Sequence, residues 1–218
     1  MNSSSFLRSP GAALVADASV IININGTGHA TDIIRAMPHA FTVTENACAE
    51  LEAGSRRGHD DYARLLELID AGIVRRVSLG ATGLTVYESL IDGSTVRTLD
   101  DGEAATIAHA HATFGIALID ERKARSLCAT SFPKLAIVPT VELLMHDAIA
   151  TALGADRQAD AIVNALTRAR MQVPPEHVAK VCALIGPERT AQCASLPKVA
   201  RAAGSGQCKR KPFRTVRP

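Results

Sequence analysis

Two aspartates lie where the chemistry of a folded chain could bring them together. Asp17 directly follows an apolar run at residues 12–16, and Asp120 follows another at residues 116–119. In an open α/β sheet the functional crevice lies beyond the carboxyl ends of the strands, at the point where the winding reverses. Two predicted strands that each end in Asp therefore favour one shared acidic crevice. A single aspartate at such a place would more often be a helix cap or a loop acid.

Further acids follow other predicted elements. Glu103 lies in the first turn of a predicted helix, where Asp101 can act as the cap and an acid also complements the helix dipole. Three glutamates, Glu45, Glu50 and Glu52, follow the second predicted strand. Each lies roughly 100° from the centre of the apolar stripe of its helix, so periodicity does not choose among them.

Carboxylates that converge in this way need positive charge. Two of them about 4 Å apart repel by roughly 4 kcal/mol at an effective dielectric constant of 20. Oxygen ligands suit Mg²⁺ or Mn²⁺, and a pair of such ions can activate water and stabilise the departing oxygen of a phosphodiester. Hydrolysis of nucleic acid is therefore the leading chemical hypothesis.

The composition excludes several classes of protein. The chain of 218 residues is 47% hydrophobic and 21% charged, so it can form a core and is neither disordered throughout nor a coiled coil. Aromatic residues make up only 3%, which excludes a surface that binds single strands by stacking bases. The net charge of +2 hides an acidic body and a basic segment from residue 187 onward, which could contact polyanions.

Cysteine usage and hydropathy bear on localisation. The five cysteines are odd in number and none has C-x-x-C spacing, so we expect reduced thiols in a cytoplasmic protein. No run of about 18 apolar residues exists, so no association with a membrane is expected.

Short apolar runs alternate with helical patterns, which predicts a parallel sheet covered by helices. The predicted strands are residues 12–16, 40–43, 74–79, 116–119 and 135–138. A helix is expected over 60–71, and another after Thr140, whose side chain could cap it. We predict a sheet domain over 1–153, a helical extension over 154–186 that packs on it, and a basic, disordered tail over 187–218.

Four segments together resemble the PIN-domain family of metal-dependent nucleases, which includes the VapC-type toxin ribonucleases. The resemblance covers about residues 12–186. It rests on the order and spacing of Val15-Ala16-Asp17-Ala18-Ser19, Ala47-Cys48-Ala49-Glu50-Leu51, Gly102-Glu103-Ala104-Ala105 and Leu118-Ile119-Asp120-Glu121 followed by Arg122-Lys123-Ala124-Arg125.

The resemblance implies a fold and a set of site residues. The fold is a three-layer α/β structure with a five-stranded parallel sheet in the order 3-2-1-4-5 and a C-terminal helical extension. The metal-binding and catalytic acids of the family fall on Asp17, Glu50, Glu103 and Asp120, which would hold one or two Mg²⁺ or Mn²⁺ ions.

Three further residues receive supporting roles. Ser19 takes the hydroxyl position of the family beside the first acid. Glu121 either orients a water from outside the metal-binding shell or is a first-turn helix acid. Arg125 either approaches a crevice carboxylate or a phosphate, or belongs to a solvated basic face.

The function implied is that of a Mg²⁺- or Mn²⁺-dependent endoribonuclease that hydrolyses single-stranded RNA. Resemblance to the VapC-type toxins adds a role in a toxin–antitoxin pair, an antitoxin or other regulatory protein as a partner, and a homodimer. The alternative is a catalytically silent PIN-like scaffold that binds RNA or protein.

Overall fold

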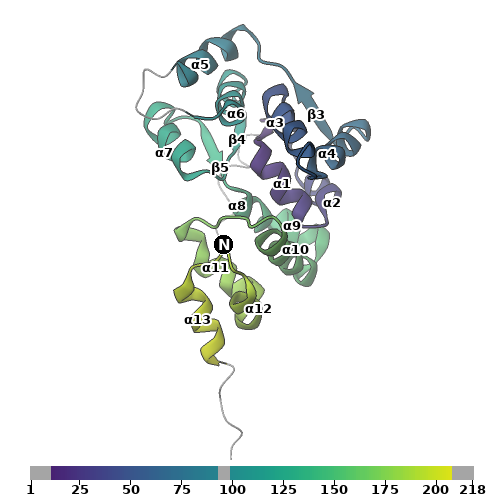
Figure 1. The fold of residues 1–218 in the computed structure, drawn as a ribbon, viewed down its shortest axis with the longest axis vertical. Helices are drawn as coiled ribbons and strands as arrows, with labels where there is room; N and C mark the ends of the chain where they lie inside the picture. The colour runs from purple at the N-terminus through teal and green to yellow at the C-terminus, as the bar shows by residue number, and fades with distance from the viewer. Residues whose placement is uncertain (1–10, 93–98, 208–218) are drawn as a thin grey trace, which may run out of the picture.

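The computed structural model describes residues 11–92 and 99–207, and its centre is a single sheet of five parallel strands (Figure 1). Their spatial order is β3-β2-β1-β4-β5. This confirms the predicted α/β class and the predicted order of strands. The strands are β1 (Leu14–Ala16), β2 (Phe41–Thr44), β3 (Val74–Val77), β4 (Ile116–Leu118) and β5 (Ala136–Val138).

The central strand β1 explains why this part of the sequence is continuously apolar. Leu14 pairs with Phe41 of β2 on one side and with Ile116 of β4 on the other. All three residues of β1 are buried, because helices cover both faces of a parallel sheet. The backbone N–H of Asp17 then donates to the carbonyl of Leu118 at 3.2 Å, which fixes the first aspartate beside the end of β4.

Helices make up most of the rest of the described chain. In chain order they are α1 (Ala18–Gly26), α2 (Ala30–Ala36), α3 (Glu45–Ser55), α4 (Asp61–Asp70), α5 (Ala81–Ile91), α6 (Asp101–Ala112), α7 (Arg122–Ser131), α8 (Thr140–Leu144), α9 (Asp147–Leu153), α10 (Ala155–Arg168), α11 (Pro175–Ile185), α12 (Pro187–Gln192) and α13 (Lys198–Gln207).

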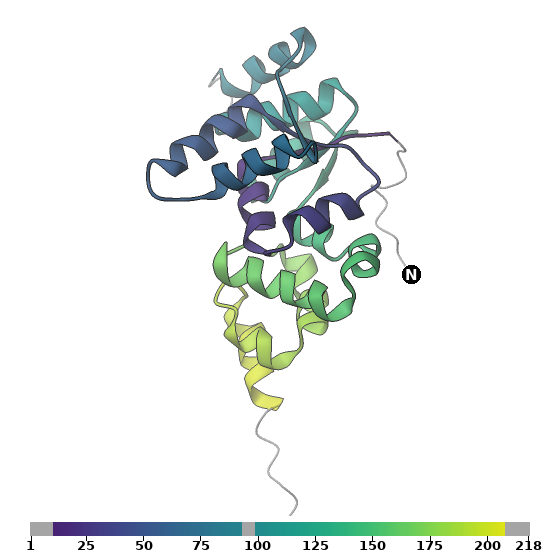
Figure 2. The same ribbon diagram turned by 90° about the vertical axis from the view of Figure 1, so that its right-hand side faces the viewer.

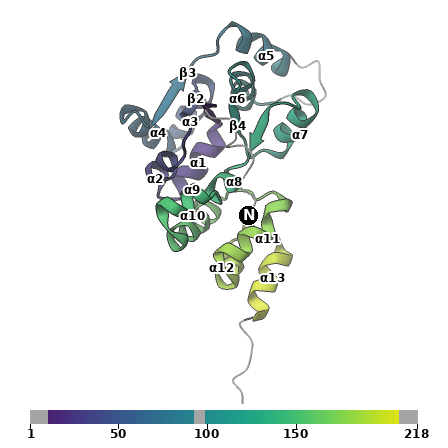
Figure 3. The ribbon, with the colours of Figure 1, turned by 180° about the vertical axis from the view of Figure 1, so that it is seen from behind.

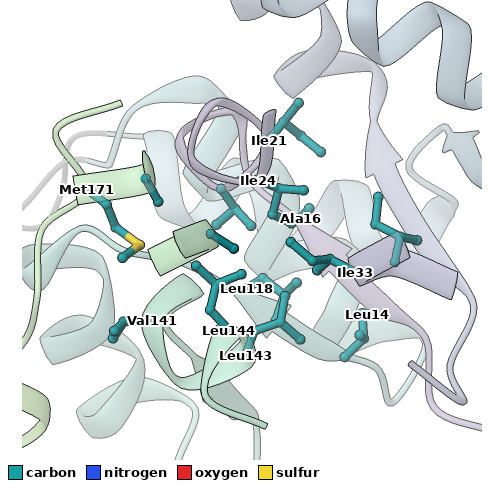
Figure 4. Close-up of a cluster of buried hydrophobic side chains, with 14 of the residues drawn as sticks. Leu14, Ala16, Ile21, Ile24, Ile33, Leu118, Val141, Leu143, Leu144 and Met171 are labelled. Atoms are coloured by element: carbon teal, nitrogen blue, oxygen red, sulfur yellow. The ribbon is translucent and has the colours of Figure 1, made fainter. Parts of the chain in front are cut away.

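The two faces of the sheet carry separate cores, and alternate strand residues contribute to each. Leu14 and Leu118 belong to the larger core, with side chains of α1 to α4 and of α8 to α11. Figure 4 shows these two leucines among apolar side chains from several elements. Val15 and Ile119 belong to the smaller core, with α5, α6 and α7. The view from behind shows the sheet between these helices, with β3 and α4 at one side and α7 at the other (Figure 3).

The C-terminal helices continue away from the sheet (Figure 2). Helix α10 packs against α1 and α9, and α11 to α13 follow it. The prediction of disorder from residue 187 is wrong for residues 187–207, which include α12 and α13. Pro187 opens α12 after Gly186, and Cys193 and Leu196 are buried in the larger core. Two isolated buried residues produce no apolar periodicity, so the sequence pattern does not predict these helices. The cluster Lys209 to Lys211 lies outside the described residues.

Membrane-spanning helices are absent from the described ranges, where no helix combines the length and the apolar character needed to cross a bilayer.

Candidate functional site

A pocket of about 350 Å³ lies at the carboxyl ends of β1 and β4. Asp17, Glu50, Glu103 and Asp120, the four acids expected to act together, all line it. The structure therefore brings together side chains that are separated by up to about a hundred residues of sequence. The remaining lining residues come from α1, α6, α7 and the link between α10 and α11: Ser19, Ile22, Asn23, Asp100, Glu121, Arg122, Ala169, Arg170, Met171 and Gln172.

Asp17 serves the fold and the pocket at once. It is the N-cap of α1, and its Oδ2 accepts hydrogen bonds from the Ser19 hydroxyl at 2.7 Å and from the Ser19 N–H at 3.3 Å. The other oxygen, Oδ1, is buried and has no hydrogen-bond partner in the described chain. A buried carboxylate oxygen left in this way is costly unless a ligand satisfies it. Oδ2 of Asp17 thus caps the helix, and Oδ1 is the oxygen that could bind a ligand.

Asp120 is held by three donors. The Asn23 amide donates to Oδ2 at 2.6 Å, and the Thr140 hydroxyl donates to the same oxygen at 2.6 Å. The Thr140 N–H donates to Oδ1 at 2.7 Å. These bonds fix the orientation of the carboxylate and leave a free lone-pair site on Oδ1.

The sequence pattern did not predict that Thr140 and Asn23 donate hydrogen bonds to Asp120. The Thr140 side chain was expected to cap the next helix, but Pro139 occupies the N-cap position of α8 and Thr140 binds Asp120 instead. Asn23 was missed. The available signal was that Asn23 comes four residues after Ser19, which places both side chains on one face of the helix, whereas the second amide of α1, Asn25, lies on another.

Glu50 is the glutamate of α3 that reaches the pocket, whereas Glu45 and Glu52 do not line it. Its place depends on Gly102 in the first turn of α6. A Cβ built on Gly102 would lie 2.6 Å from Glu50 Oε2 and 3.3 Å from Asp17 Oδ1. Only glycine lets the backbone of α6 approach these two carboxylates so closely.

Glu103 is buried, with 5% of its surface exposed. Its backbone N–H donates at 2.8 Å to Asp100, which is the N-cap of α6 in place of the predicted Asp101. Asp100 also lines the pocket and is a fifth carboxylate that the sequence analysis did not select. Asp101 instead accepts hydrogen bonds from Asn46, at 2.9 Å, and from Tyr87.

The electrostatics of the pocket favour bound positive charge. Burial, opposed by the hydrogen bond from Ser19, raises the pKa of Asp17 to about 6. Partial burial and the charges of neighbouring acids raise the pKa of Glu50, which keeps an exposed surface, to about 7. Burial and neighbouring acids raise the pKa of Glu103 to about 8. Burial also raises the pKa of Asp120, against the hydrogen bonds from Thr140 and Asn23. A cation among these groups would relieve their repulsion and restore the charged forms.

Glu121 and Arg125 lie close to the pocket in different roles. Glu121 is the N-cap of α7, where its carboxylate accepts from the Ala124 N–H at 2.8 Å, and it also lines the pocket. Arg125 does not line the pocket. Its guanidinium lies 3.7 Å from Glu176 of α11, and its charge reduces the rise that burial causes in the pKa of Asp120. In the described chain Arg125 thus pairs with Glu176, while its buried Nε has no hydrogen-bond partner.

The donor set fits a hard divalent cation. All six acids that line the pocket offer carboxylate oxygens, which Mg²⁺ and Mn²⁺ prefer, and Asp17 Oδ1 lacks any partner in the described chain. Across residues 11–92 and 99–207, no group of three or more His, Cys, Asp and Glu side chains has an arrangement ready to hold a metal ion. The potential ligands of a cation therefore lie in one pocket, but in the described chain they do not adopt a complete coordination geometry.

The fold and the pocket define a class: an open α/β protein whose acidic site lies at the carboxyl ends of its central strands. A family model described as a PIN domain matches residues 13–187. The chain belongs to the PIN-domain family, and this membership indicates a nuclease-type function. No curated protein and no solved structure matches the chain significantly.

Proposed function

We propose that this protein is an endoribonuclease that uses Mg²⁺ or Mn²⁺ to hydrolyse phosphodiester bonds in single-stranded RNA. The observation that carries the proposal is the convergence of Asp17, Glu50, Glu103 and Asp120 on one pocket, where Asp17 Oδ1 is buried without a partner. A protein that used these acids only for structure would be expected to pair or cap all of their oxygens.

All four acids would bind the metal, and three polar side chains would orient the two aspartates. Asp17 and Asp120 at the strand ends would hold one or two ions, with Glu50 and Glu103 completing the oxygen ligands. When bound, the ions would supply a more acidic water and stabilise the charge that develops on the departing oxygen. Ser19 holds the Asp17 carboxylate through Oδ2 and leaves Oδ1 without a partner, whereas Asn23 and Thr140 hold Asp120 through both of its oxygens.

The pocket also limits the kind of substrate. None of the described residues that line the pocket is aromatic, so recognition would rest on the phosphate backbone and on the shape of the strand. Binding should therefore weaken steeply as the salt concentration rises. The resemblance to the VapC-type toxins also suggests a role as a toxin, a homodimer, and an antitoxin or other regulatory protein that covers the pocket, and these are part of this proposal.

The test is cleavage of labelled single-stranded RNA with Mn²⁺ or Mg²⁺. We expect Asp17→Asn, Asp120→Asn and Glu50→Gln each to reduce the rate by about 100-fold or more, because each removes a ligand charge at the reacting centre. Glu52→Gln is the matched control, since it lies on the same helix outside the pocket. Chelation of the metal should abolish cleavage by the wild type.

Two results would overturn the proposal. Equal cleavage by the wild type and all variants would identify a contaminating nuclease. Cleavage by none, under all metal conditions, would favour a silent PIN-like scaffold that binds RNA or protein. The toxin role has a separate test, because harmless expression of an enzyme that is active in the tube would count against it.

A further inference from the structure

Two arginines line the acidic pocket, and neither is paired with another residue of the described chain. Arg122 is the first residue of α7, and Arg170 lies in the link between α10 and α11. Both are exposed. In the described chain neither guanidinium takes part in a hydrogen bond or an ion pair, in contrast to Arg125 with its contact to Glu176.

The backbone of Arg170 has an uncommon conformation. Its φ is +56°, in the left-handed region that residues other than glycine seldom adopt. Such a conformation costs on the order of 1 kcal/mol or more and persists only where the surroundings impose it. The conformation indicates that packing against other elements fixes the backbone of residues 169–172.

The packing of the residues on either side of Arg170 fixes its position. Ala169 packs so tightly on the last residue of α1 that a Cβ on Gly26 would lie 2.8 Å from the Ala169 Cβ. Met171 is 1% exposed, and its N–H donates to the carbonyl of Ala165 at 3.0 Å. Figure 4 shows the Met171 side chain pointing toward the core. Arg170 is thus held between two anchored neighbours at the edge of the pocket.

The negative charge of the pocket would repel RNA, and the two arginines can offset that repulsion. Six carboxylates line it, counting Asp100 and Glu121 with the four proposed ligands, and they repel the phosphates of an approaching strand. One or two divalent ions offset only part of that charge. Guanidinium groups beside the carboxylates can bind phosphate oxygens by paired, charge-assisted hydrogen bonds.

We propose that Arg170, together with Arg122, binds the backbone phosphates of single-stranded RNA that flank the scissile bond and so fixes the path of the strand across the carboxylates. This inference rests on the proposed function. It makes the link between α10 and α11, at residues 169–172, a part of the substrate site.

The experiment measures RNA binding and cleavage separately in the full chain. Binding of a fluorescent single-stranded RNA is followed by anisotropy with Ca²⁺ in place of Mg²⁺, over a series of salt concentrations, and a gel confirms that the RNA stays intact. The variants are Arg170→Gln, Arg170→Lys and Arg122→Gln. Arg168→Gln is the matched control, because Arg168 is exposed two residues away and does not line the pocket.

We expect Arg170→Gln and Arg122→Gln each to weaken binding about tenfold and to reduce the log–log salt slope by about 0.7, the value for one phosphate contact on a single strand. Arg170→Lys should keep the slope and recover part of the affinity, since it keeps the charge but loses the paired geometry. Mn²⁺ binding without RNA, measured by electron paramagnetic resonance, should match the wild type in every arginine variant.

Wild-type affinity and slope in both Gln variants would overturn the inference even if the wild type cleaves RNA. If the wild type binds RNA but never cleaves it, a loss of slope in the variants still supports the arginine site while the proposed nuclease activity fails. A wild type that binds no RNA overturns both.

Discussion

The two strand-end aspartates differ in how their oxygens are used. Asp120 accepts three hydrogen bonds, whereas Asp17 keeps one oxygen, Oδ1, without a partner. Asp120 is therefore the better oriented of the two, and Asp17 is the one that gains most from a bound cation. In proteins, groups that orient metal ligands often matter nearly as much as the ligands.

Thr140 tests this orientation. The change Thr140→Val removes the hydroxyl that donates to Asp120 while nearly keeping the volume of a side chain that is fully buried. We expect the Mn²⁺ affinity to fall about tenfold, the usual lower range for loss of a group that orients a ligand. Thr140→Ser keeps the hydroxyl and should bind Mn²⁺ like the wild type. Equal Mn²⁺ affinity in both variants would show that this hydrogen bond does not serve the site.

The raised pKa values also predict how stability depends on pH. Asp17, Glu50 and Glu103 have pKa values of about 6, 7 and 8 in the folded protein, above those of the unfolded chain. The folded state therefore binds more protons, and its stability is greatest below about pH 4 for these groups and is lost as the pH rises toward 8. We expect the metal-free protein to lose about 1 kcal/mol of unfolding free energy between pH 5 and pH 8, mainly through the buried Asp17 and Glu103, because solvent screens the charge of the exposed Glu50.

Denaturant unfolding in EDTA at the two pH values measures this loss. Glu103→Gln should be more stable than the wild type at pH 8, because it removes a buried charge, and should lose less between the two values. Glu52→Gln, which changes an exposed glutamate, should follow the wild type. Added Mn²⁺ should restore wild-type stability at pH 8. A stability that rises with pH in EDTA would contradict the raised pKa values.

At the scale of elements, the sequence predicted what depends on local pattern. The strands β1 and β4 were found because burial on both faces makes them continuously apolar. The choice of Glu50 over Glu45 and Glu52 came only from the family resemblance, because all three lie at similar angles from the apolar stripe. Asp100 as a pocket residue could not be predicted, because its place depends on how α6 approaches α3 and α1 in three dimensions.

Gly102 is where that approach is closest. The change Gly102→Ala places a Cβ 2.6 Å from Glu50 Oε2 and 3.3 Å from Asp17 Oδ1, so the Glu50 carboxylate must move. Because alanine favours a helix by about 1 kcal/mol over glycine and the displaced group is the end of a flexible side chain, stability should stay level or rise. We expect the cleavage rate to fall about tenfold or more, since the ligand set is disturbed.

Gly83→Ala in α5 provides the comparison. A Cβ at Gly83 makes only ordinary contacts, the nearest at 3.5 Å from Leu79, and the residue lies outside the pocket. This variant should keep both stability and activity. Thermal unfolding and RNA cleavage measured on both variants separate the two effects. A Gly102→Ala protein with wild-type cleavage would show that the close approach of α6 has no functional consequence.

At the scale of the whole molecule, the helices beyond the sheet contribute to the site as well as to the core. The sequence predicted residues 154–186 only as a cover for the sheet. In the structure, the Asn164 amide donates to the carbonyl of Thr27 at 3.1 Å, and the link that follows α10 lines the acidic pocket. The matched family region extends to residue 187 and includes this link. The join between α1 and the link therefore couples the helical extension to the pocket.

The contact between Gly26 and Ala169 tests that coupling. In Gly26→Ala the new Cβ would lie 2.8 Å from the Ala169 Cβ, so α1 and the link must separate. Overpacking of this kind costs about 1–3 kcal/mol of stability, and the shift of Arg170 should weaken RNA binding several-fold. The double variant Gly26→Ala with Ala169→Gly removes the clash and should recover most of both losses, measured by denaturant unfolding and by anisotropy. If the double variant is no better than Gly26→Ala alone, the loss does not arise from this contact, and the link is not held against α1 in the way the structure shows.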